Sequence, residues 1–516
     1  MKGEPMITAN RHRRSLASAV ALTLALPATA WATNGYFAHG WGTKSKAMAG
    51  VAAALPQDTL VTATNPAGMA FLGRRFDIGV AFFHPSDRGY QANSDFATQT
   101  VPATVQTPDG FQDFNVQFPA GGFVTPGRVD SDSDWFLIPS IGYNHPLNER
   151  SSIGISIYGN GGMNTDYPTA VWENFAPAPN QQVVNGQPVF ATVPAGTPIA
   201  AGGRVLIEDG APIPVTSPFP GSENGNPNGI LTATANTGVN LEQLFIEVPY
   251  TIKLADNQAF GIAPVFAVQS FEAEGLEPFR AASVNPQKVT NNGKDWSYGA
   301  GLHLGWYGKV SETLALGLSY RTKMWMSDFD DYRGLFADGG AFDIPAMFNF
   351  GFAYEVSPTL TLGFDYQHIF YNEIDAISNS NDFDLAPCFG ASPKPSYCLG
   401  GAAGLGFGWD SMDVFKLGVR WDQSEQWKFF GGASYNTEFL KTDRESLFNV
   451  LAPATVRWHL TLGATYAHSA NDEFNLAFSY MPKETVNGTS PSITGAQTGS
   501  LYMEQMDIEI SWNHRF

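Results

Sequence analysis

The sequence has few charged residues for its length, and it has no long apolar run outside one stretch near the N-terminus. Charged side chains make up 15% of the 516 residues, whereas aromatic side chains make up 13%. Beyond that first stretch no run of eighteen apolar residues occurs, so the sequence offers no transmembrane helix. Low charge, many aromatics and no long apolar run are typical of a transmembrane β-barrel, in which only alternate residues meet lipid.

Basic residues and cysteines are also scarce. Lys and Arg number 29 against 48 Asp and Glu, a net charge of −19, so too few cations are present to neutralise the phosphates of a nucleic acid. Cys388 and Cys398 are the only cysteines, and they lie ten residues apart in a stretch rich in Pro, Gly and Ser. In an exported chain the favoured interpretation is a disulfide that closes a loop, with a metal site as the alternative. We expect no cofactor.

The N-terminus has the pattern of a secretory signal peptide. Arg11, Arg13 and Arg14 form a basic region, and Leu16–Leu26 is an eleven-residue apolar core that is too short to span a bilayer. Two small-x-small sites follow, and cleavage after Ala32 is favoured over an uncleaved anchor. Removing residues 1–32 takes away four basic residues and one acidic residue, which makes the net charge of the mature chain −22.

Short polar turns predict the number of strands. Six of them separate alternating segments, at 146–151, 254–258, 309–313, 355–359, 422–426 and 469–473. The stretches between consecutive turns are long, polar and rich in Pro and Gly, as in surface loops; the longest runs from about Pro168 to Thr237. Six hairpins supply twelve strands, and strands at 75–83 and 506–516 complete an all-β antiparallel barrel of about fourteen.

Period-2 alternation supports the strands. Apolar residues share one face of the first strand, of the third, of the twelfth and of the last: Phe76, Ile78, Val80 and Phe82; Ile153, Ile155 and Ile157; Leu460 and Leu462; Ile508, Ile510, Trp512 and Phe516. Any single strand could also belong to a soluble β-sandwich, but fourteen strands in which short turns alternate with long loops favour the barrel.

The forty residues before the first strand, 33–72, are mostly small or apolar. Eight strands enclose only their own side chains, whereas sixteen or more leave an aqueous channel, so a lumen of intermediate size would leak unless something occupied it. We therefore expect residues 33–72 to form a plug in the lumen, because a disordered tail would be more charged. The expected organisation is a signal peptide at 1–32, an N-terminal plug (hatch) at 33–72 and an outer-membrane barrel at 73–516.

The signal peptide, the segment with Asn65-Pro66-Ala67, the fourteen strands and the terminal Phe516 together resemble the long-chain fatty-acid transporter (FadL) family. That family includes toluene and xylene channels, and residues 35–50 also look like the opening of many members. The resemblance covers essentially the whole mature chain. It implies passive uptake of hydrophobic molecules by plug rearrangement and lateral exit through a gap at a kinked third strand. The loops at 91–130 and 168–237 depart from the best-known members, which leaves the substrate open.

Carried over to this sequence, the resemblance assigns site residues. The plug element consists of Asn65, Pro66 and Ala67, and beside it the kink consists of Gly159, Asn160, Gly161 and Gly162. Glycine weakens a regular strand and marks a bulge or bend, although a strand that simply ends in its loop is the alternative. Arg321 and Lys323 share a face of the seventh strand and are candidate contacts for a carboxylate headgroup, with internal salt bridges as the alternative.

Several functions remain open at this stage. We expect the partners to be hydrophobic small molecules, foremost long-chain fatty acids, with outer-membrane lipid and lipopolysaccharide around a monomeric barrel. A general porin has no use for an apolar plug, and no G-x-S-x-G or H-E-x-x-H motif indicates an enzyme. An aromatic hydrocarbon channel and a structural or adhesive barrel stay as alternatives.

Overall fold

The computed structural model describes residues 34–95, 98–107, 110–119, 123–173, 182–184, 187–189, 236–381, 388, 394–443, 445–490 and 497–516. The expected signal peptide at 1–32 and most of the long stretch at 168–237 lie outside these residues. Within the described ranges, no helix is both long and apolar enough to cross a membrane.

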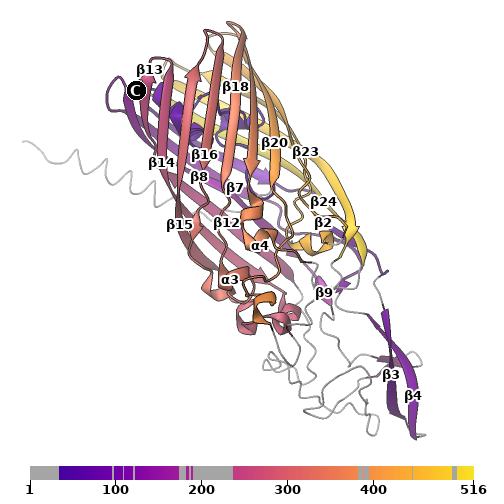
Figure 1. Ribbon diagram of the computed structural model, residues 1–516. Coiled ribbons are helices and arrows are strands. Elements are labelled where there is room, and N and C mark those ends of the chain that lie inside the picture. The colour runs from indigo at the N-terminus through magenta and orange to yellow at the C-terminus, as the bar shows by residue number, and fades with distance from the viewer. Residues whose placement is uncertain are drawn as a thin grey trace, which may run out of the picture.

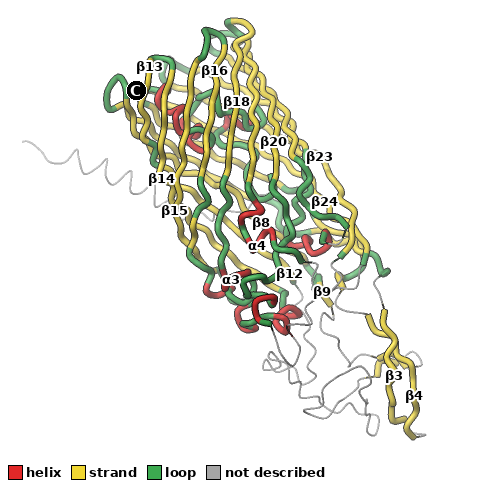
Figure 2. Tube along the Cα trace, viewed as in Figure 1, coloured by secondary structure: helices red, strands yellow, loops and turns green. Residues whose placement is uncertain are grey.

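Fourteen antiparallel strands close into a barrel (Figure 1, Figure 2). In chain order they are β1 Arg75–His84, β7 Phe136–Pro146, β8 Ser151–Tyr167, β12 Thr237–Glu247 continued by β13 Tyr250–Ala255, β14 Gln258–Glu274, β15 Asp295–Lys309, β16 Leu314–Arg321, β18 Met347–Ser357, β19 Leu360–Ile369, β20 Met412–Asp422, β21 Trp427–Asn436, β22 Trp458–Ala467, β23 Asp472–Thr489 and β24 Thr498–Arg515. β1 pairs with β24 from Arg75 opposite Arg515 to His84 opposite Met506, so the barrel has no open edge. The predicted fourteen-stranded barrel is confirmed.

The six predicted turns join β7 to β8, β13 to β14, β15 to β16, β18 to β19, β20 to β21 and β22 to β23. They lie together at one end of the barrel, and the loops with short helices lie at the other (Figure 2). The last strand begins at Thr498, eight residues earlier than predicted, because its first part continues the ladder with β23.

The loop end carries the remaining elements. β2 Gly89–Ala92 pairs with β24 and with β6 Gly127–Asp130, and β17 Trp325–Met326 pairs with β15. Three small sheets pair β3 Thr98–Thr107 with β4 Gly110–Pro119, β5 Phe123–Val124 with β9 Trp172–Glu173, and β10 Gln182–Val184 with β11 Gln187–Val189. The helices of the loops are η3 Glu277–Ala282, η4 Pro286–Lys288, η5 Asp330–Tyr332, α3 Ala337–Gly340, η6 Tyr371–Glu373, α4 Asp375–Ser378, η7 Pro395–Tyr397 and η8 Ser446–Leu451.

The two faces of the wall differ as the alternation predicts. Apolar side chains point outward and are exposed, as at Ile78, Leu460 and Leu462. Their neighbours along the strands point inward and are buried and polar, as at Asp77 and Thr461. An apolar outside and a polar inside reverse the arrangement of a soluble protein and suit a barrel surrounded by lipid.

Leu462 tests this orientation, because it lies at the middle of β22 and is 65% exposed. Leu462→Arg should lower the free energy of unfolding in lipid vesicles by about 2–4 kcal/mol, since a charge on the lipid face is costly near the bilayer midplane. Leu462→Met is the matched control and should change stability little. Equal stability of the Arg and Met variants would contradict the assigned orientation.

Candidate functional site

The N-terminal segment, residues 34–73, lies inside the barrel (Figure 1). Almost all of its side chains up to Met69 are buried, yet its only helices are α2 Thr43–Lys46, η1 Thr59–Ala63 and η2 Pro66–Phe71. The side chain of Asp58 caps η1 by accepting from Leu60 N at 3.1 Å, and that of Asn65 caps η2 by accepting from Ala67 N at 3.1 Å. Proline suits the first position of such a turn, which explains the Asn-Pro-Ala sequence locally.

Most backbone groups of this segment need partners outside it, because it contains so little regular structure. Lumen-facing side chains of the wall supply them. The carboxylate of Asp365 accepts from Ala52 N at 2.7 Å and from Ala53 N at 2.8 Å. Backbone carbonyls of the segment accept from further wall residues, among them Asn144, Ser156, Ser319, Asn349 and Lys416. The wall is therefore built to hold this backbone.

Ion pairs fix the segment to the wall near the seam of the barrel, where β1 pairs with the last strand, β24. Lys44 pairs with Glu473 at 2.5 Å, and Lys46 pairs with both Asp507 and Glu509 at 2.9 Å. Burial alone would lower the pKa of Lys46, but the two carboxylates outweigh burial and the pKa is raised.

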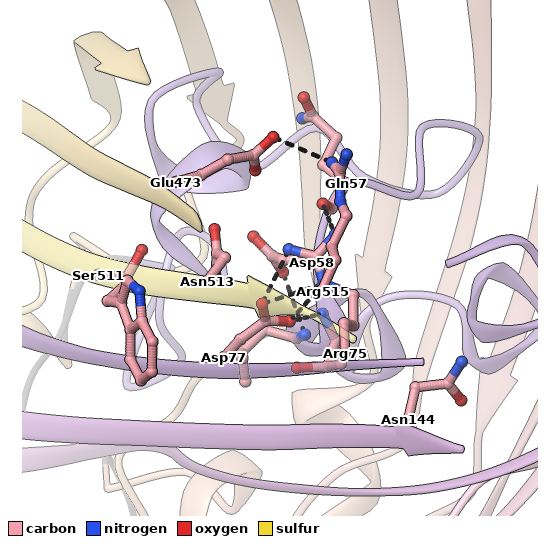
Figure 3. Close-up of polar contacts among 12 residues, drawn as sticks. Gln57, Asp58, Arg75, Asp77, Asn144, Glu473, Ser511, Asn513 and Arg515 are labelled. Atoms are coloured by element: carbon pink, nitrogen blue, oxygen red, sulfur yellow. Dashed lines mark hydrogen bonds and ion pairs between the residues drawn. The ribbon is translucent and has the colours of Figure 1, made fainter. Parts of the chain in front are cut away.

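A second polar group joins the segment to the start of β1. Figure 3 shows Arg75, Asp77 and Gln57 converging beside Asp58. Arg75 donates to Asp77 and to the carbonyl of Gln57, and Asp77 accepts from Thr59 N at 2.7 Å. Buried charges so thoroughly paired serve to position the segment, because an unpaired charge in the same place would be costly.

Glycines in the strands mark the closest approach between the wall and the segment. A Cβ at Gly261 would lie 2.5 Å from Ala67 N, and one at Gly418 would lie 2.8 Å from the Cβ of Met48. A Cβ at Gly317 would collide with the carbonyl oxygen of Ala53. The sequence analysis missed these residues, although glycine at an inward position of an alternating strand is a signal for close backbone contact.

Asn65, Pro66 and Ala67 lie against β14 and β15. The Asn65 amide donates to Trp306 O on β15 at 2.9 Å and to Ala53 O at 2.8 Å. The sequence placed this tripeptide beside the kink of β8; in the structure, the part of the segment that hydrogen-bonds to the kink is Tyr36–Trp41. The first described residues of the segment contact Tyr371, which follows β19 on the loop side, whereas the last ones lead into β1, which begins at the turn end.

The strand β8 has a bulge at Asn160. Gly159 pairs with Leu244 and Gly161 with Gln243, which leaves Asn160 without a partner in the β12 ladder. On the other side, β7 pairs with β8 only from Ser152 to Tyr158.

The N-terminal segment takes the place of β7 beyond Tyr158. Ala38 N donates to Asn160 O at 3.0 Å, and Gly162 N donates to Tyr36 O at 2.8 Å. A Cβ at Gly161 would collide with that Tyr36 carbonyl. The pairing between β7 and β8 thus stops here, and two backbone hydrogen bonds from the segment replace it.

Arg321 lies at the end of β16 with its side chain fully buried. Its guanidinium faces three aromatic rings at 4.7–5.8 Å, those of Phe37, Trp41 and Phe245. Its Nη2 donates to Asn160 Oδ1 at 3.1 Å, whereas Nε and Nη1 have no hydrogen-bond partner among the described residues. A buried guanidinium with open N–H groups can receive an anionic or polar group at little further desolvation cost.

Lys323 is in a different situation, because it pairs with Asp343 at 2.8 Å and is partly exposed. His303, directly opposite Arg321 in the sheet, is fully buried. Its Nδ1 lies 3.3 Å from a carboxylate oxygen of Glu247, and its Nε2 has no partner within the described part of the chain. The sequence analysis missed His303 and Glu247, since only the strand register places them beside Arg321.

A small apolar pocket of about 40 Å³ lies among the loops at the loop end, lined among others by Val239, Leu276, Phe279 and Phe407. A row of aromatic rings leads inward from it. The distances between the centroids of consecutive rings are 4.6 Å from Phe271 to Phe336, 4.9 Å from Phe336 to Phe342, 6.2 Å from Phe342 to Tyr36 and 5.3 Å from Tyr36 to Phe37. The row connects the pocket with Arg321 without interruption.

A disulfide joins Cys388 and Cys398, whose Cα atoms are 5.6 Å apart. It closes part of the loop between β19 and β20, and the next residue, Leu399, lines the apolar pocket. Among the described residues no group of three or more His, Cys, Asp or Glu could hold a metal ion.

Comparisons with known proteins bear on this arrangement. The family model described as outer membrane protein transport protein (OMPP1/FadL/TodX) matches residues 19–191. No curated protein matches the sequence. Similar solved structures include the P. putida toluene transporter TodX, with 15% identity, a TM-score of 0.56 and coverage of 93% of this chain and 99% of that one. A Pseudomonas aeruginosa FadL homologue has 14% identity, a TM-score of 0.56 and coverage of 93% and 100%. The Ralstonia pickettii toluene transporter TbuX has 14% identity, a TM-score of 0.50 and coverage of 93% of this chain and 99% of that one.

The family model of outer-membrane transport proteins thus matches the N-terminal third of this chain, and the fourteen-stranded barrel has the same fold as these solved transporters. The resemblance to the FadL family seen in the sequence is confirmed. The matching family is described as one of transport proteins.

Replacing Lys46 should release the segment. Lys46→Met leaves Asp507 and Glu509 buried without their cation, and we expect a loss of about 3–5 kcal/mol in the free energy of unfolding. Lys44→Met is the matched control and should cost less, because Glu473 keeps a contact with Arg515 at 3.0 Å. Chemical denaturation in lipid vesicles checks this, and equal losses in the two variants would contradict it.

Asp58 should make the seating of the segment pH-dependent. Burial, aided by the neighbouring Asp77 carboxylate, raises the pKa of Asp58 to about 7. Because this pKa lies above that of an exposed aspartate, about 4, the seated state loses stability as the pH rises through about 7. In planar bilayers the ion leak through the protein should be smaller at pH 6 than at pH 8. Asp58→Asn, which keeps an acceptor for Leu60 N, should remove the difference.

Proposed function

We propose that this protein takes up long-chain fatty acids through the outer membrane. The observation that carries the proposal is Arg321, a buried cation with open N–H groups at the inner end of an aromatic row. A fatty acid needs both features, an apolar path for its chain and a cation for its carboxylate. A path for bare hydrocarbons alone would not need a buried guanidinium, which is expensive to desolvate.

The proposed route begins at the apolar pocket among the loops. Burying one methylene is worth roughly 0.8 kcal/mol, so a single site that held a whole long chain would release it too slowly. The pocket, the aromatic row and Arg321 instead offer partial sites in sequence. From Arg321 the substrate passes the Asn160 bulge and leaves sideways between β7 and β8, where the N-terminal segment closes the wall. Sideways exit into lipid spares the chain a passage through water.

The N-terminal segment acts as the plug in this proposal. Residues 1–32 are a cleaved signal peptide, 33–72 form the plug and 73–516 the barrel, which works as a monomer surrounded by lipid and lipopolysaccharide. Asn65, Pro66 and Ala67 anchor the plug to β14 and β15, and they leave Tyr36–Trp41 as the part that moves at the gap. Lys323 is ion-paired with Asp343 and is not a headgroup contact.

An aromatic hydrocarbon channel is the second candidate. Two of the similar structures are described as toluene transporters, and a row of aromatic rings also suits a monoaromatic ligand. In such a channel Arg321 would only bind Asn160 and the rings around it, and its loss would not discriminate among substrates.

Uptake of labelled oleate by cells that lack their own fatty-acid channel and express this chain decides between the candidates. Arg321→Met should reduce oleate uptake about 10- to 100-fold, as expected for the loss of charge-assisted hydrogen bonds, and leave toluene entry nearly unchanged. Lys323→Met is the control and should keep most of the uptake.

Three results count against the proposal. Oleate uptake that toluene competes away, with Arg321→Met affecting neither compound, would favour the hydrocarbon channel. No uptake of either compound by a correctly assembled barrel would leave the structural or adhesive alternative. Uptake that survives disruption of the Asn65-Pro66-Ala67 anchor would contradict the role of the plug.

A further inference from the structure

Asn160 touches both the cation site and the gap in the wall. Its side chain is fully buried, with Oδ1 accepting from Arg321 Nη2 at 3.1 Å and Nδ2 donating to Gln243 Oε1 at 2.9 Å. Its backbone carbonyl accepts from Ala38 N at 3.0 Å. The same residue is unpaired in the ladder between β8 and β12. The position of the bulge therefore depends on side-chain contacts of Asn160 in place of strand pairing.

These contacts continue toward the substrate path. Gln243 Nε2 donates to Gln269 Oε1 at 3.1 Å, and Gln269 Nε2 donates to the carbonyl of Phe342 at 2.7 Å. Phe342 is the member of the aromatic row that packs against Tyr36. A buried polar chain thus links the bulge of β8 with the aromatic row, and Asn160 is the end of that chain at the wall.

We propose that Asn160 is a positioning residue that couples occupancy of the Arg321 site to opening of the gap between β7 and β8. The inference rests on the proposed function and adds how the site is regulated. A carboxylate that binds the open N–H groups of Arg321 draws the guanidinium away from the Asn160 amide, because hydrogen bonds between two charged groups are about twice as strong as neutral ones. Asn160 Oδ1 then loses its donor, and the bulge is released.

The released bulge favours the open wall. From Gly159 to Gly162 the edge of β8 is closed by the N-terminal segment: Ala38 N donates to Asn160 O, Gly162 N donates to Tyr36 O, and Trp41 Nε1 donates to Gly159 O at 3.1 Å. Release of Asn160 disturbs the carbonyl that Ala38 needs, so a few hydrogen bonds break together. A neutral hydrocarbon cannot compete for the guanidinium and leaves the bulge in place. The headgroup therefore sets the rate of exit.

The test compares oleate with methyl oleate, which has the same chain without the charge. In vesicles that contain the full chain, the unaltered protein should pass oleate faster than methyl oleate. Asn160→Ala should raise methyl oleate passage on the order of tenfold, which corresponds to one lost hydrogen bond, and bring the ratio of the two rates close to one. Asn160→Asp should slow both compounds, because its carboxylate would pair permanently with Arg321.

Asn164→Ala is the matched control. Asn164 lies on the same strand and bonds Asn240 of β12 at 3.2 Å, and no hydrogen bond to Arg321 is found for it in the described part of the chain. It should keep the ratio of the unaltered protein. An unchanged ratio in Asn160→Ala, or an equal change in Asn164→Ala, overturns the coupling.

Hydrogen exchange at the amides of Ala38 and Gly162 gives a readout that does not depend on transport. Oleate, but not methyl oleate, should speed exchange in the unaltered protein, and Asn160→Ala should exchange fast without ligand. Equal exchange in the two proteins without ligand overturns the coupling. Suppose that Asn160→Ala exchanges fast while the unaltered protein takes up no oleate. That result supports Asn160 as the determinant of the gap and overturns the proposed function instead.

Discussion

The structure depends on one constraint: a segment with little helix and no strand of its own lies inside a barrel, where its backbone groups need hydrogen-bond partners. The wall meets this constraint with inward carboxylates, amides and hydroxyls, such as Asp365 and Asn349, and with glycines where the backbones touch. The polar lumen and the lipid-facing apolar surface follow from the same alternation. The inward side chains of the wall therefore match the backbone groups of the segment that they hold.

The same constraint accounts for the weak place in the wall. Where β7 leaves β8, the N-terminal segment supplies the missing backbone partners through Tyr36 and Ala38. Elsewhere the wall is closed by ladders of up to sixteen residue pairs, as between β23 and β24. A handful of hydrogen bonds can break without unfolding the barrel, whereas a long ladder cannot, which is why the proposed exit lies where the segment replaces a strand.

Charges in the lumen divide into two kinds. Lys44, Lys46 and Arg75 are paired with carboxylates and fix the segment near the seam. Arg321 is equally buried, but it is surrounded by aromatic rings and bonded to the amide of Asn160. Paired charges make a rigid anchor, while a cation with open N–H groups offers a place for a ligand. The anchoring charges and the cation that we propose to bind the substrate are thereby separated along one lumen.

The sequence by itself determined the barrel, its six turns and the lipid-facing residues, because alternation and turn chemistry are local properties that each segment carries alone. It also marked Gly159–Gly162 as an irregular stretch of strand. Only the tertiary structure decided that Tyr36–Trp41 meets this bulge, that Asn65 meets β15, and that Arg321 and Lys323 have different partners. Contacts between the segment and the wall join residues as much as 466 positions apart, as in Thr43 with Glu509. They depend on the register in which the closed barrel surrounds the segment.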